Sequence, residues 1–249
     1  MRDLFILGIY PHAIEMAEMV ARINARGAVW NLLGFVSPDG ASVGDQLVGL
    51  PIVTYNEALE RSPSAALTPT FEWPNKADLP RNRLASLTDP SAVIASSAQI
   101  GLGCVIFPHC YVGARARIGD FLFCLAGSVI NHNDIIEDRV TITSGVVLAG
   151  DVHVEEDCYL GQSSTVRELI RIGKGSIIGM GCVVLHDVAP NSVMVGNPAR
   201  RLGAREHNFP GMHLMKSVQR VGRKGLKVAH QIFLGALARY AALRRQAAH

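Results

Sequence analysis

The sequence predicts a mainly β protein whose central part is a parallel β-helix built from repeats of six residues. An aliphatic residue recurs at every sixth position from Ile94 to Val184, in fifteen of sixteen places, and no insertion breaks the run. Four residues after each aliphatic position, small or β-branched residues dominate, as at Cys104 and Val146. A strict period of six suits a coil of three short strands, about eighteen residues per turn, in which equivalent residues stack. An α-helix would require a period of about 3.6 residues and does not fit.

The five cysteines are expected to be small core residues. Cys124 lies on the aliphatic row, and the other four lie on the small row: Cys104, Cys110, Cys158 and Cys182. Buried free cysteine behaves as a small hydrophobic residue, and no CxxC pair suggests zinc. We therefore expect neither a nucleophile nor a metal ligand among them, and reduced thiols agree with a cytoplasmic protein.

The chain divides into three predicted regions, namely residues 1–85, 86–202 and 203–249. In the first region an apolar strand, LFILGI, precedes a segment with helical spacing, PHAIEMAEMVARIN, and a second strand lies near VWNLLGFV. This β-α-β order predicts a small Rossmann-like α/β domain. The second region is the β-helix, and the third is a basic tail with helical spacing.

The composition separates a mildly acidic body from this basic tail. Residues 207–249 contain eight Lys or Arg and no Asp or Glu, which leaves sixteen basic and twenty-one acidic residues elsewhere. The tail is expected either to contact an anionic membrane surface peripherally or to pack as a helix with solvated charges. It has no recognisable nucleic-acid motif, so no nucleic-acid partner is predicted. No apolar run reaches the roughly 18 residues of a membrane span, which favours a soluble protein.

Two segments of the repeat region, GSVINHNDIIEDRVTITSGVVLAGDVHVEEDCYLG and IIGMGCVVLHDVAPNSVMVGNPARRL, resemble the hexapeptide-repeat sugar acyltransferases related to sialic acid O-acetyltransferase. That family includes N-acetyltransferases that act on nucleotide-linked amino sugars in bacterial glycan synthesis. The segment LFILGIYPHAIEMAEMV resembles its N-terminal domain, so the resemblance covers residues 3 to about 202. It implies a left-handed β-helix, a homotrimer, acetyl-CoA as acyl donor, and a sugar or sugar-nucleotide acceptor.

The resemblance also implies roles for particular residues. The position of the catalytic base is His132, and imidazole titrates near the pH at which an attacking amine or hydroxyl must lose its proton. A backbone amide for the thioester oxyanion is expected at Gly150. Further cofactor contacts are expected at Thr141, Gln162, Gly179, Met180 and Gly181, and acceptor contacts at Gly8, Tyr10, His12 and Ser37.

Two departures from the family pattern lie beside the base. Asn133 replaces the carboxylate that usually follows the base; an amide can orient the ring but adds no charge. Asp134 falls on an inward position that usually holds a small residue, and a buried carboxylate without partners is costly. We hypothesise that Asp134 supports the active-site turn by bonding backbone amides or reaching toward His132. The alternative is a deformed corner that lets Asp134 reach water.

Two further departures concern ligand contacts. Thr141 stands where the family has a second histidine that contacts acetyl-CoA. The N-terminal phosphate loop reads GIYPHA, so Tyr10 and Pro11 replace small residues and one backbone N–H is lost. Nucleotide binding by this loop is therefore weakened relative to the family.

Two other interpretations of the repeat compete with an acetyltransferase: an enzyme that catalyses a different reaction, and a protein without enzymatic activity. Hexapeptide-repeat carbonic anhydrases bind zinc through histidines on adjacent coils, but His109, His132 and His153 are not spaced by eighteen residues, so no metal is expected. A trimeric scaffold or regulatory protein that has lost the chemistry is the alternative to an acetyltransferase. Acetyl-CoA binding would distinguish the two.

Overall fold

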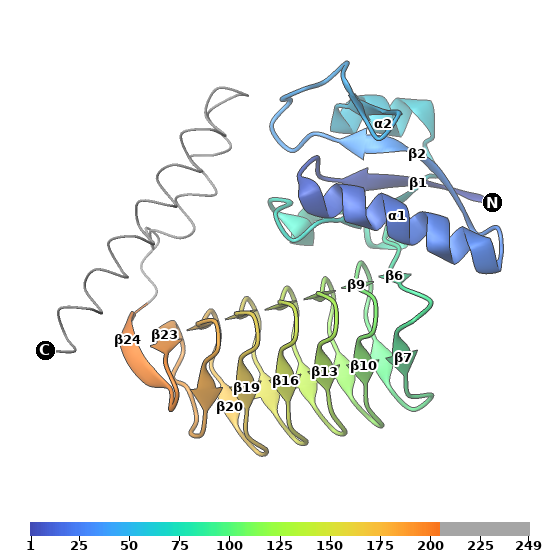
Figure 1. Ribbon diagram of the computed structural model, residues 1–249. Helices are drawn as coiled ribbons and strands as arrows, with labels where there is room; N and C mark the ends of the chain where they lie inside the picture. Colours follow the sequence, from blue (N-terminus) through green and yellow to red (C-terminus); the bar gives the residue numbers. More distant parts are fainter. Residues whose placement is uncertain (205–249) are drawn as a thin grey trace, which may run out of the picture. The chain divides into compact units, whose positions relative to one another are not determined.

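The computed structural model describes residues 1–204 (Figure 1). The predicted basic tail, and its predicted membrane contact, lie outside the described residues apart from its first positions. No helix within residues 1–204 has the length and hydropathy needed to cross a membrane.

The N-terminal part is a small α/β unit, as the sequence predicts. Its sheet has the strand order β3-β4-β2-β1-β5, and every pair is parallel except β3 with β4. The elements are β1 (Arg2–Leu7), α1 (Pro11–Arg26), β2 (Trp30–Val36), β3 (Gln46–Leu47), β4 (Leu50–Val53), α2 (Tyr55–Arg61) and β5 (Ala66–Pro69). Two single-turn 3₁₀ helices, Lys76–Asp78 and Arg81–Arg83, lead into the β-helix.

Local sequence explains both helices of this unit. Pro11 opens α1, where its missing N–H costs no intrahelical bond. The apolar spacing of α1 buries Met16 and Met19 completely. At the start of α2, Thr54 and Glu57 form a capping box, in which each side chain accepts a hydrogen bond from the other residue's backbone N–H.

The rest of the described chain is a parallel β-helix with three faces, and the predicted left-handed fold is confirmed. Face I contains β7, β10, β13, β16, β19 and β22; face II contains β8, β11, β14, β17 and β20; face III runs from β6 through β9, β12, β15, β18, β21 and β23 to β24. The strands are β6 (Leu87–Thr88), β7 (Val93–Ile94), β8 (Gln99–Ile100), β9 (Val105–Ile106), β10 (Tyr111–Val112), β11 (Arg117–Ile118), β12 (Phe123–Cys124), β13 (Val129–Ile130), β14 (Ile135–Ile136), β15 (Thr141–Ile142), β16 (Val147–Leu148), β17 (His153–Val154), β18 (Tyr159–Leu160), β19 (Thr165–Val166), β20 (Arg171–Ile172), β21 (Ile177–Ile178), β22 (Val183–Val184), β23 (Ser192–Val195) and β24 (Arg200–Ala204).

The register confirms the predicted coil. Tyr111 pairs with Val129, and Val129 pairs with Val147, so partners lie eighteen residues apart. The turns repeat every six residues with a left-handed backbone, for example at Asn133 (φ 62°) and Asp151 (φ 60°). Asn and Asp tolerate this conformation better than most side chains.

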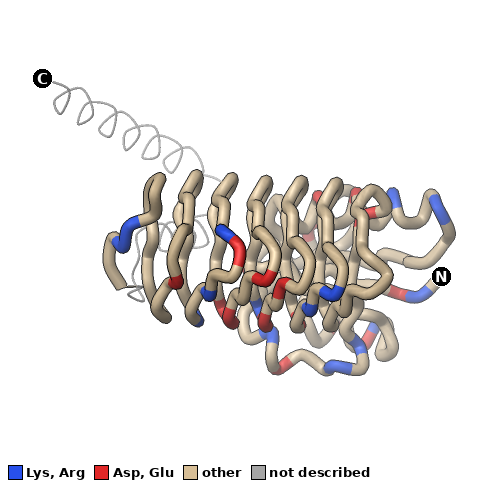
Figure 2. The backbone as a smooth tube through the Cα atoms, turned by 90° about the horizontal axis from the view of Figure 1, so that it is seen from below, with Lys and Arg blue, Asp and Glu red and all other residues tan. Residues whose placement is uncertain are grey.

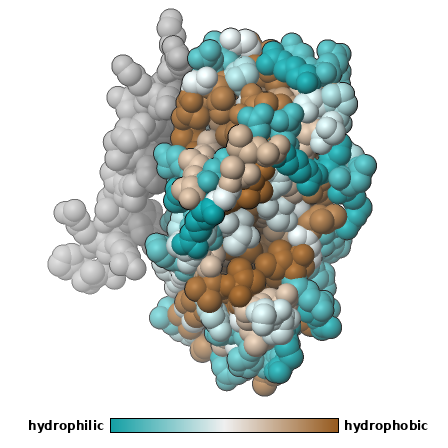
Figure 3. All heavy atoms as spheres, turned by 90° about the vertical axis from the view of Figure 1, so that its right-hand side faces the viewer, coloured by the Kyte–Doolittle hydropathy of each residue, from teal (hydrophilic) through white to brown (hydrophobic). Residues whose placement is uncertain are grey.

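The outward residues differ between faces. Along face I they are almost uncharged, as at Val129 and Val147, whereas face II carries Arg117, His153 and Arg171. Figure 2 shows this contrast, with charged residues gathered on one side of the coils. The first coil has no coil before it, so its inward aliphatic residues are only partly covered. Figure 3 shows the resulting apolar surface at that end of the β-helix.

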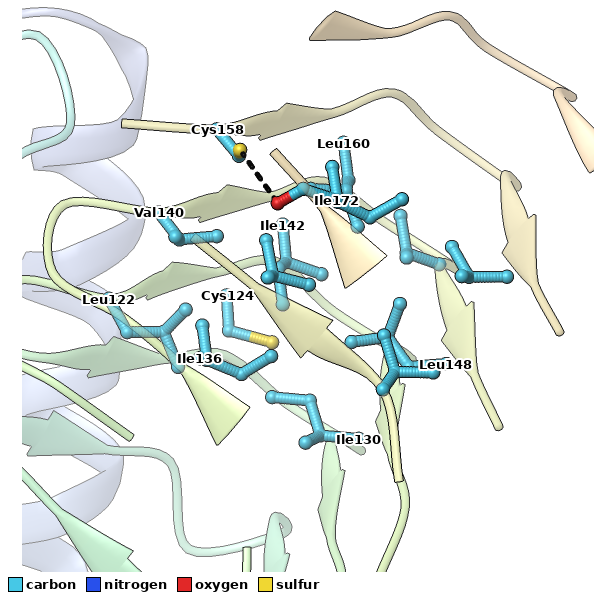
Figure 4. Close-up of a cluster of buried hydrophobic side chains, with 14 of the residues drawn as sticks. Leu122, Cys124, Ile130, Ile136, Val140, Ile142, Leu148, Cys158, Leu160 and Ile172 are labelled. Atoms are coloured by element: carbon cyan, nitrogen blue, oxygen red, sulfur yellow. Dashed lines mark hydrogen bonds between the residues drawn. The ribbon is translucent and has the colours of Figure 1, made fainter. Parts of the chain in front are cut away.

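The inward residues form one continuous core (Figure 4). The aliphatic row stacks through Ile130, Leu148 and Val166, all fully buried. All five cysteines are free and buried, which confirms the sequence-based interpretation.

A second core joins the α/β unit to face III of the β-helix. Met16 and Met19 of α1 belong to one cluster with Val105 and Phe123, which point outward from β9 and β12. Arg22 of α1 also forms an ion pair with Asp89, at 2.7 Å. The α/β unit therefore covers face III near the start of the β-helix and leaves the edge between faces I and II free of these contacts.

Candidate active site

His132 lies in the turn between β13 and β14, at the edge where faces I and II meet. Its side chain is 58% exposed, as expected for an outward turn position. The ring nitrogen Nδ1 lies 3.3 Å from Nδ2 of Asn133 and 3.8 Å from a carboxylate oxygen of Asp151. The ring thus faces an amide donor and a carboxylate acceptor on the same side.

The choice between these two neighbours decides the tautomer of His132. An amide N–H can donate to Nδ1 only when Nδ1 is unprotonated, which places the ring proton on Nε2. A carboxylate accepts from Nδ1–H and leaves the lone pair on Nε2 free to take a proton. General-base chemistry at Nε2 therefore needs the proton on Nδ1, a tautomer that the nearby Asp151 carboxylate favours and the amide N–H of Asn133 does not.

Asp151 is a site residue that the sequence analysis missed. It follows Asn133 by eighteen residues and occupies the same turn position on the next coil, where Nδ2 of Asn133 donates to Oδ1 of Asp151 at 2.9 Å. A carboxylate thus lies beside the His132 turn, on the adjacent coil. The repeat of eighteen, applied to the turn residues as well as the core, would have found it.

Gly150 lies directly against the imidazole. A Cβ atom at Gly150 would meet the His132 ring at 2.3–2.9 Å, so only glycine allows this stacking. Within residues 1–204 its N–H donates no hydrogen bond, while its carbonyl accepts one from Leu169. Gly150 is buried under the ring, and its N–H is left without a partner within the described residues.

Asp134 is completely buried, so the alternative in which it reaches water is wrong. Its two carboxylate oxygens accept hydrogen bonds from the backbone N–H groups of Asn131 and Val152, each at 2.8 Å. Burial raises the pKa of Asp134 to about 7, against the two amides, which favour the charged form. Of the two ways in which Asp134 was expected to support the turn, the structure shows the first: the carboxylate bonds backbone amides and does not bond His132.

This bonding changes the ladder next to the base. The N–H of Asn131 turns to Asp134, and the side-chain amide of Asn131 donates instead to the carbonyl of Leu148, at 2.9 Å. As a result, β13 and β16 pair through one residue each, Val129 and Val147, whereas adjacent rungs of face I pair through two. Asp134 and Asn131 together set the backbone from which His132 projects. The sequence analysis missed Asn131.

The predicted cofactor residues fall into separate groups. Gln162 lies in the turn after β18, and the carbonyl of Gln162 accepts from the N–H of Gly181 at 2.8 Å. Gly179 and Met180, which is 76% exposed, lie in the same turn as Gly181, at the edge between faces III and I. His132 and Gly150 lie at the other edge of face I.

Thr141 belongs to neither edge. It lies in β15 on face III, between Phe123 and Tyr159 in register, and is 8% exposed. A single chain therefore does not place Thr141 beside His132.

The predicted acceptor residues lie at the carboxyl ends of the parallel strands of the α/β unit, where ligands commonly bind in such sheets. Gly8 follows β1, and a Cβ there would meet the Thr70 hydroxyl at 2.5 Å. Ser37 follows β2 and is 5% exposed. Tyr10 precedes α1 without capping it through its side chain.

His12 is tied to face III. Its Nδ1 lies 3.0 Å from Glu72, and its ring packs edge-on against Phe71 and Phe123. Burial opposes the charged ring, but the hydrogen bond to Glu72 and the charges of Glu72 and Glu15 together outweigh it and raise the pKa of His12. Among the described residues, one carboxylate oxygen of Glu72 has no hydrogen-bond partner. The acceptor residues and His132 are thus on different sides of the β-helix, and the structure does not bring them together within one chain.

No group of three His, Cys, Asp or Glu within residues 1–204 is placed to hold a metal ion. His153 bonds Glu137 on face II at 2.7 Å, away from the turn that holds His132.

No known protein-family model matches the sequence. Over 130 residues the chain is 31% identical to an acyl-[acyl-carrier-protein]–UDP-N-acetylglucosamine O-acyltransferase of Pseudomonas syringae, which covers 48% of this chain and 49% of that protein. The chain thus spans about half the length of this curated relative.

Two solved structures cover 81% of the chain at 24% identity. One is a mutant of GDP-perosamine N-acetyl transferase from Caulobacter crescentus in complex with CoA and GDP-perosamine, matched over 97% of its length with a TM-score of 0.71. The other is the acetyltransferase domain of PglB from Neisseria gonorrhoeae in complex with acetyl coenzyme A, matched over 99% with a TM-score of 0.72. These two structures share the fold of the chain, and the relative that the chain matches over about half its length is an acyltransferase.

Proposed function

We propose that this protein transfers an acetyl group from acetyl-CoA to an amino or hydroxyl group of a sugar that is nucleotide- or lipid-linked. The observation that carries the proposal is the arrangement at the edge of faces I and II, where Gly150 lies against the His132 ring and Asp151 lies near its Nδ1. A base, a carboxylate and a free backbone amide are the groups that acyl transfer requires. The fold neighbours with bound CoA support the same reaction class.

In the proposed reaction, Asp151 stabilises the proton that stays on Nδ1 of His132, and Nε2 removes a proton from the acceptor as its nitrogen or oxygen attacks the thioester carbon. The new C–N or C–O bond forms, the C–S bond breaks, and the CoA thiolate takes from Nε2 the proton that the acceptor gave up, which returns His132 to its neutral form. The N–H of Gly150 stabilises the oxyanion during the transfer. Transfer is direct, because the cysteines are buried and offer no nucleophile.

We propose further that the working form is a homotrimer in the cytoplasm. The candidate donor residues lie at two edges of face I, Thr141 lies on face III, and the acceptor residues belong to the unit that covers face III. A site that uses all of them requires a second copy of the chain. The nearly uncharged outward row of face I is suited to such a contact.

Acetyl-CoA is expected to bind with a stoichiometry near one per chain in calorimetric titration. His132→Ala should retain this binding, because most donor contacts lie at other residues. Absence of binding at millimolar acetyl-CoA would instead favour a non-enzymatic scaffold protein. The replacement of a carboxylate by the amide of Asn133 gives that alternative some support. If binding is found, release of the CoA thiol with a panel of nucleotide-linked, lipid-linked and free amino sugars identifies the acceptor.

Asp151→Asn is expected to lower kcat about tenfold or more with little change in KM for acetyl-CoA, because an amide no longer selects the Nδ1–H tautomer. Asp157→Asn is the matched control, since Asp157 occupies a left-handed turn position on another edge and bonds Arg139. Equal kcat for wild type and Asp151→Asn would remove Asp151 from the mechanism.

A further inference from the structure

A shallow depression of about 310 Å³ lies on the N-terminal side of the His132 turn. It is lined by Ser97, Gln99, Arg115, Arg117 and Asn133. Its lining contains two guanidinium groups and no carboxylate. The depression belongs to the coils before the base, whereas Gly150 and the other candidate donor residues belong to the coils after it.

The repeat explains why these residues converge. Ser97, Arg115 and Asn133 occupy one turn position on three successive coils, and the N–H of Arg115 donates to the Ser97 hydroxyl at 3.1 Å. Gln99 and Arg117 are register partners on face II. The two arginines are therefore neighbours on one coil, separated by a single inward residue.

Neither arginine has a carboxylate partner within the part of the chain that the structure describes. Nε of Arg115 donates to Oδ1 of Asn133 at 2.8 Å, which holds the guanidinium in place and leaves its terminal amino groups unused. By contrast, Arg139 pairs with Asp157, and Arg171 pairs with Glu155. Two unneutralised guanidinium groups that line one depression, one of them held by Asn133, are suited to a doubly or triply charged oxyanion.

A second depression limits the position of such an anion. It shares Arg117 but is also lined by Glu137, Asp138 and Glu156, and its volume is about 450 Å³. The acids there repel an anion, so the anion is confined to the side of Arg115 and Gln99.

The start of α1, where backbone N–H groups of such an α/β unit commonly bind phosphate, has lost part of this capacity in this chain. Pro11 at the start of α1 has no N–H, and the N–H of Ala13 already bonds the carbonyl of Tyr10 at 2.8 Å. The α1 terminus therefore offers fewer free amides than a glycine-rich phosphate loop.

We propose that Arg115 and Arg117 bind the pyrophosphate of the acceptor next to His132. This inference rests on the proposed transferase function and names the class of acceptor: a sugar carried on a pyrophosphate. Asn133 connects this subsite to the base, because its Oδ1 holds Arg115 while its Nδ2 contacts His132 and Asp151. Acceptor and donor then approach His132 from opposite directions along the β-helix axis.

The test is binding of inorganic pyrophosphate to the full-length protein, measured by calorimetry at low salt. Each of Arg115→Gln and Arg117→Gln should weaken binding about tenfold, the loss expected for one hydrogen bond between charged groups. Arg171→Gln is the matched control on the same face; it is paired with Glu155 and should bind like wild type. Acetyl-CoA binding, measured on every variant, shows that the fold and the donor site are intact and separates failure of this subsite from failure of the transferase proposal.

Absence of pyrophosphate binding to the wild type, or equal binding to wild type and both arginine variants, would overturn the proposal. The source of the pyrophosphate is resolved by competition with uridine diphosphate and with farnesyl pyrophosphate. Competition by either supports the subsite and assigns a nucleotide or a lipid carrier, and failure of both contradicts it.

Discussion

Replacing His132 with alanine is expected to lower kcat about 100- to 10,000-fold, the usual contribution of a positioned general base. The expectation follows from the geometry of one turn: the ring is exposed, Gly150 lies against it, and Asp151 lies on the Nδ1 side. Affinity for acetyl-CoA should change little, since the ring acts on the acceptor. The loss should therefore appear in kcat rather than in cofactor binding.

The measurement is release of the CoA thiol under saturating acetyl-CoA, with the acceptor identified in the screen. His109→Asn is the matched control, because His109 is also an exposed turn histidine and asparagine suits its left-handed backbone (φ 60°). Retention of more than a tenth of the wild-type kcat in His132→Ala would show that another group accepts the proton.

The β-helix was predictable because its signal is a repeat. Each coil buries its aliphatic row only against its neighbours, so a strict period of six in sequence becomes stacking in space. The same rule placed the cysteines inside and marked Asp134 as an inward carboxylate, and both are buried. A local conflict with the repeat thus pointed to a residue beside the candidate base.

The remaining features of the site depend on contacts that the six-residue pattern does not contain. Asp151 contacts Asn133 through turn side chains, and Asn131 reaches Leu148 only because Asp134 has taken its backbone N–H. Packing of the α/β unit on face III depends on outward residues such as Phe123, for which the repeat has no preference. The resemblance to a family predicted which residues form the site, but it did not predict on which edge or face of the β-helix each of them lies.

Asp134→Asn is expected to lower both stability and activity. The ionised carboxylate accepts from both backbone N–H groups, whereas an amide can accept from only one and turns its own NH₂ to the other. Relative to the ionised form, above about pH 7, one buried donor therefore loses its partner at a cost of about 1–3 kcal/mol. Because Asn131 precedes His132, the relaxed turn should also lower kcat about tenfold or more. Asp138→Asn is the matched control: Asp138 accepts from the N–H of Asp120 at 2.8 Å, but its side chain is 49% exposed, so water can replace the bond.

The pH dependence gives this prediction a sign. The folded chain holds the Asp134 proton up to a pKa of about 7, whereas the unfolded chain releases it near the ordinary value of 3.8. The folded state therefore binds more protons between these values, and the stability that this group contributes at acid pH is lost as pH rises from about 4 to about 7. Since the substituted amide would not titrate, the melting temperature of Asp134→Asn should lack this fall, as thermal unfolding of both proteins followed by circular dichroism would measure. A constant difference would mean that Asp134 stays charged throughout. Loss of folding with unchanged activity per folded molecule would restrict Asp134 to a structural role.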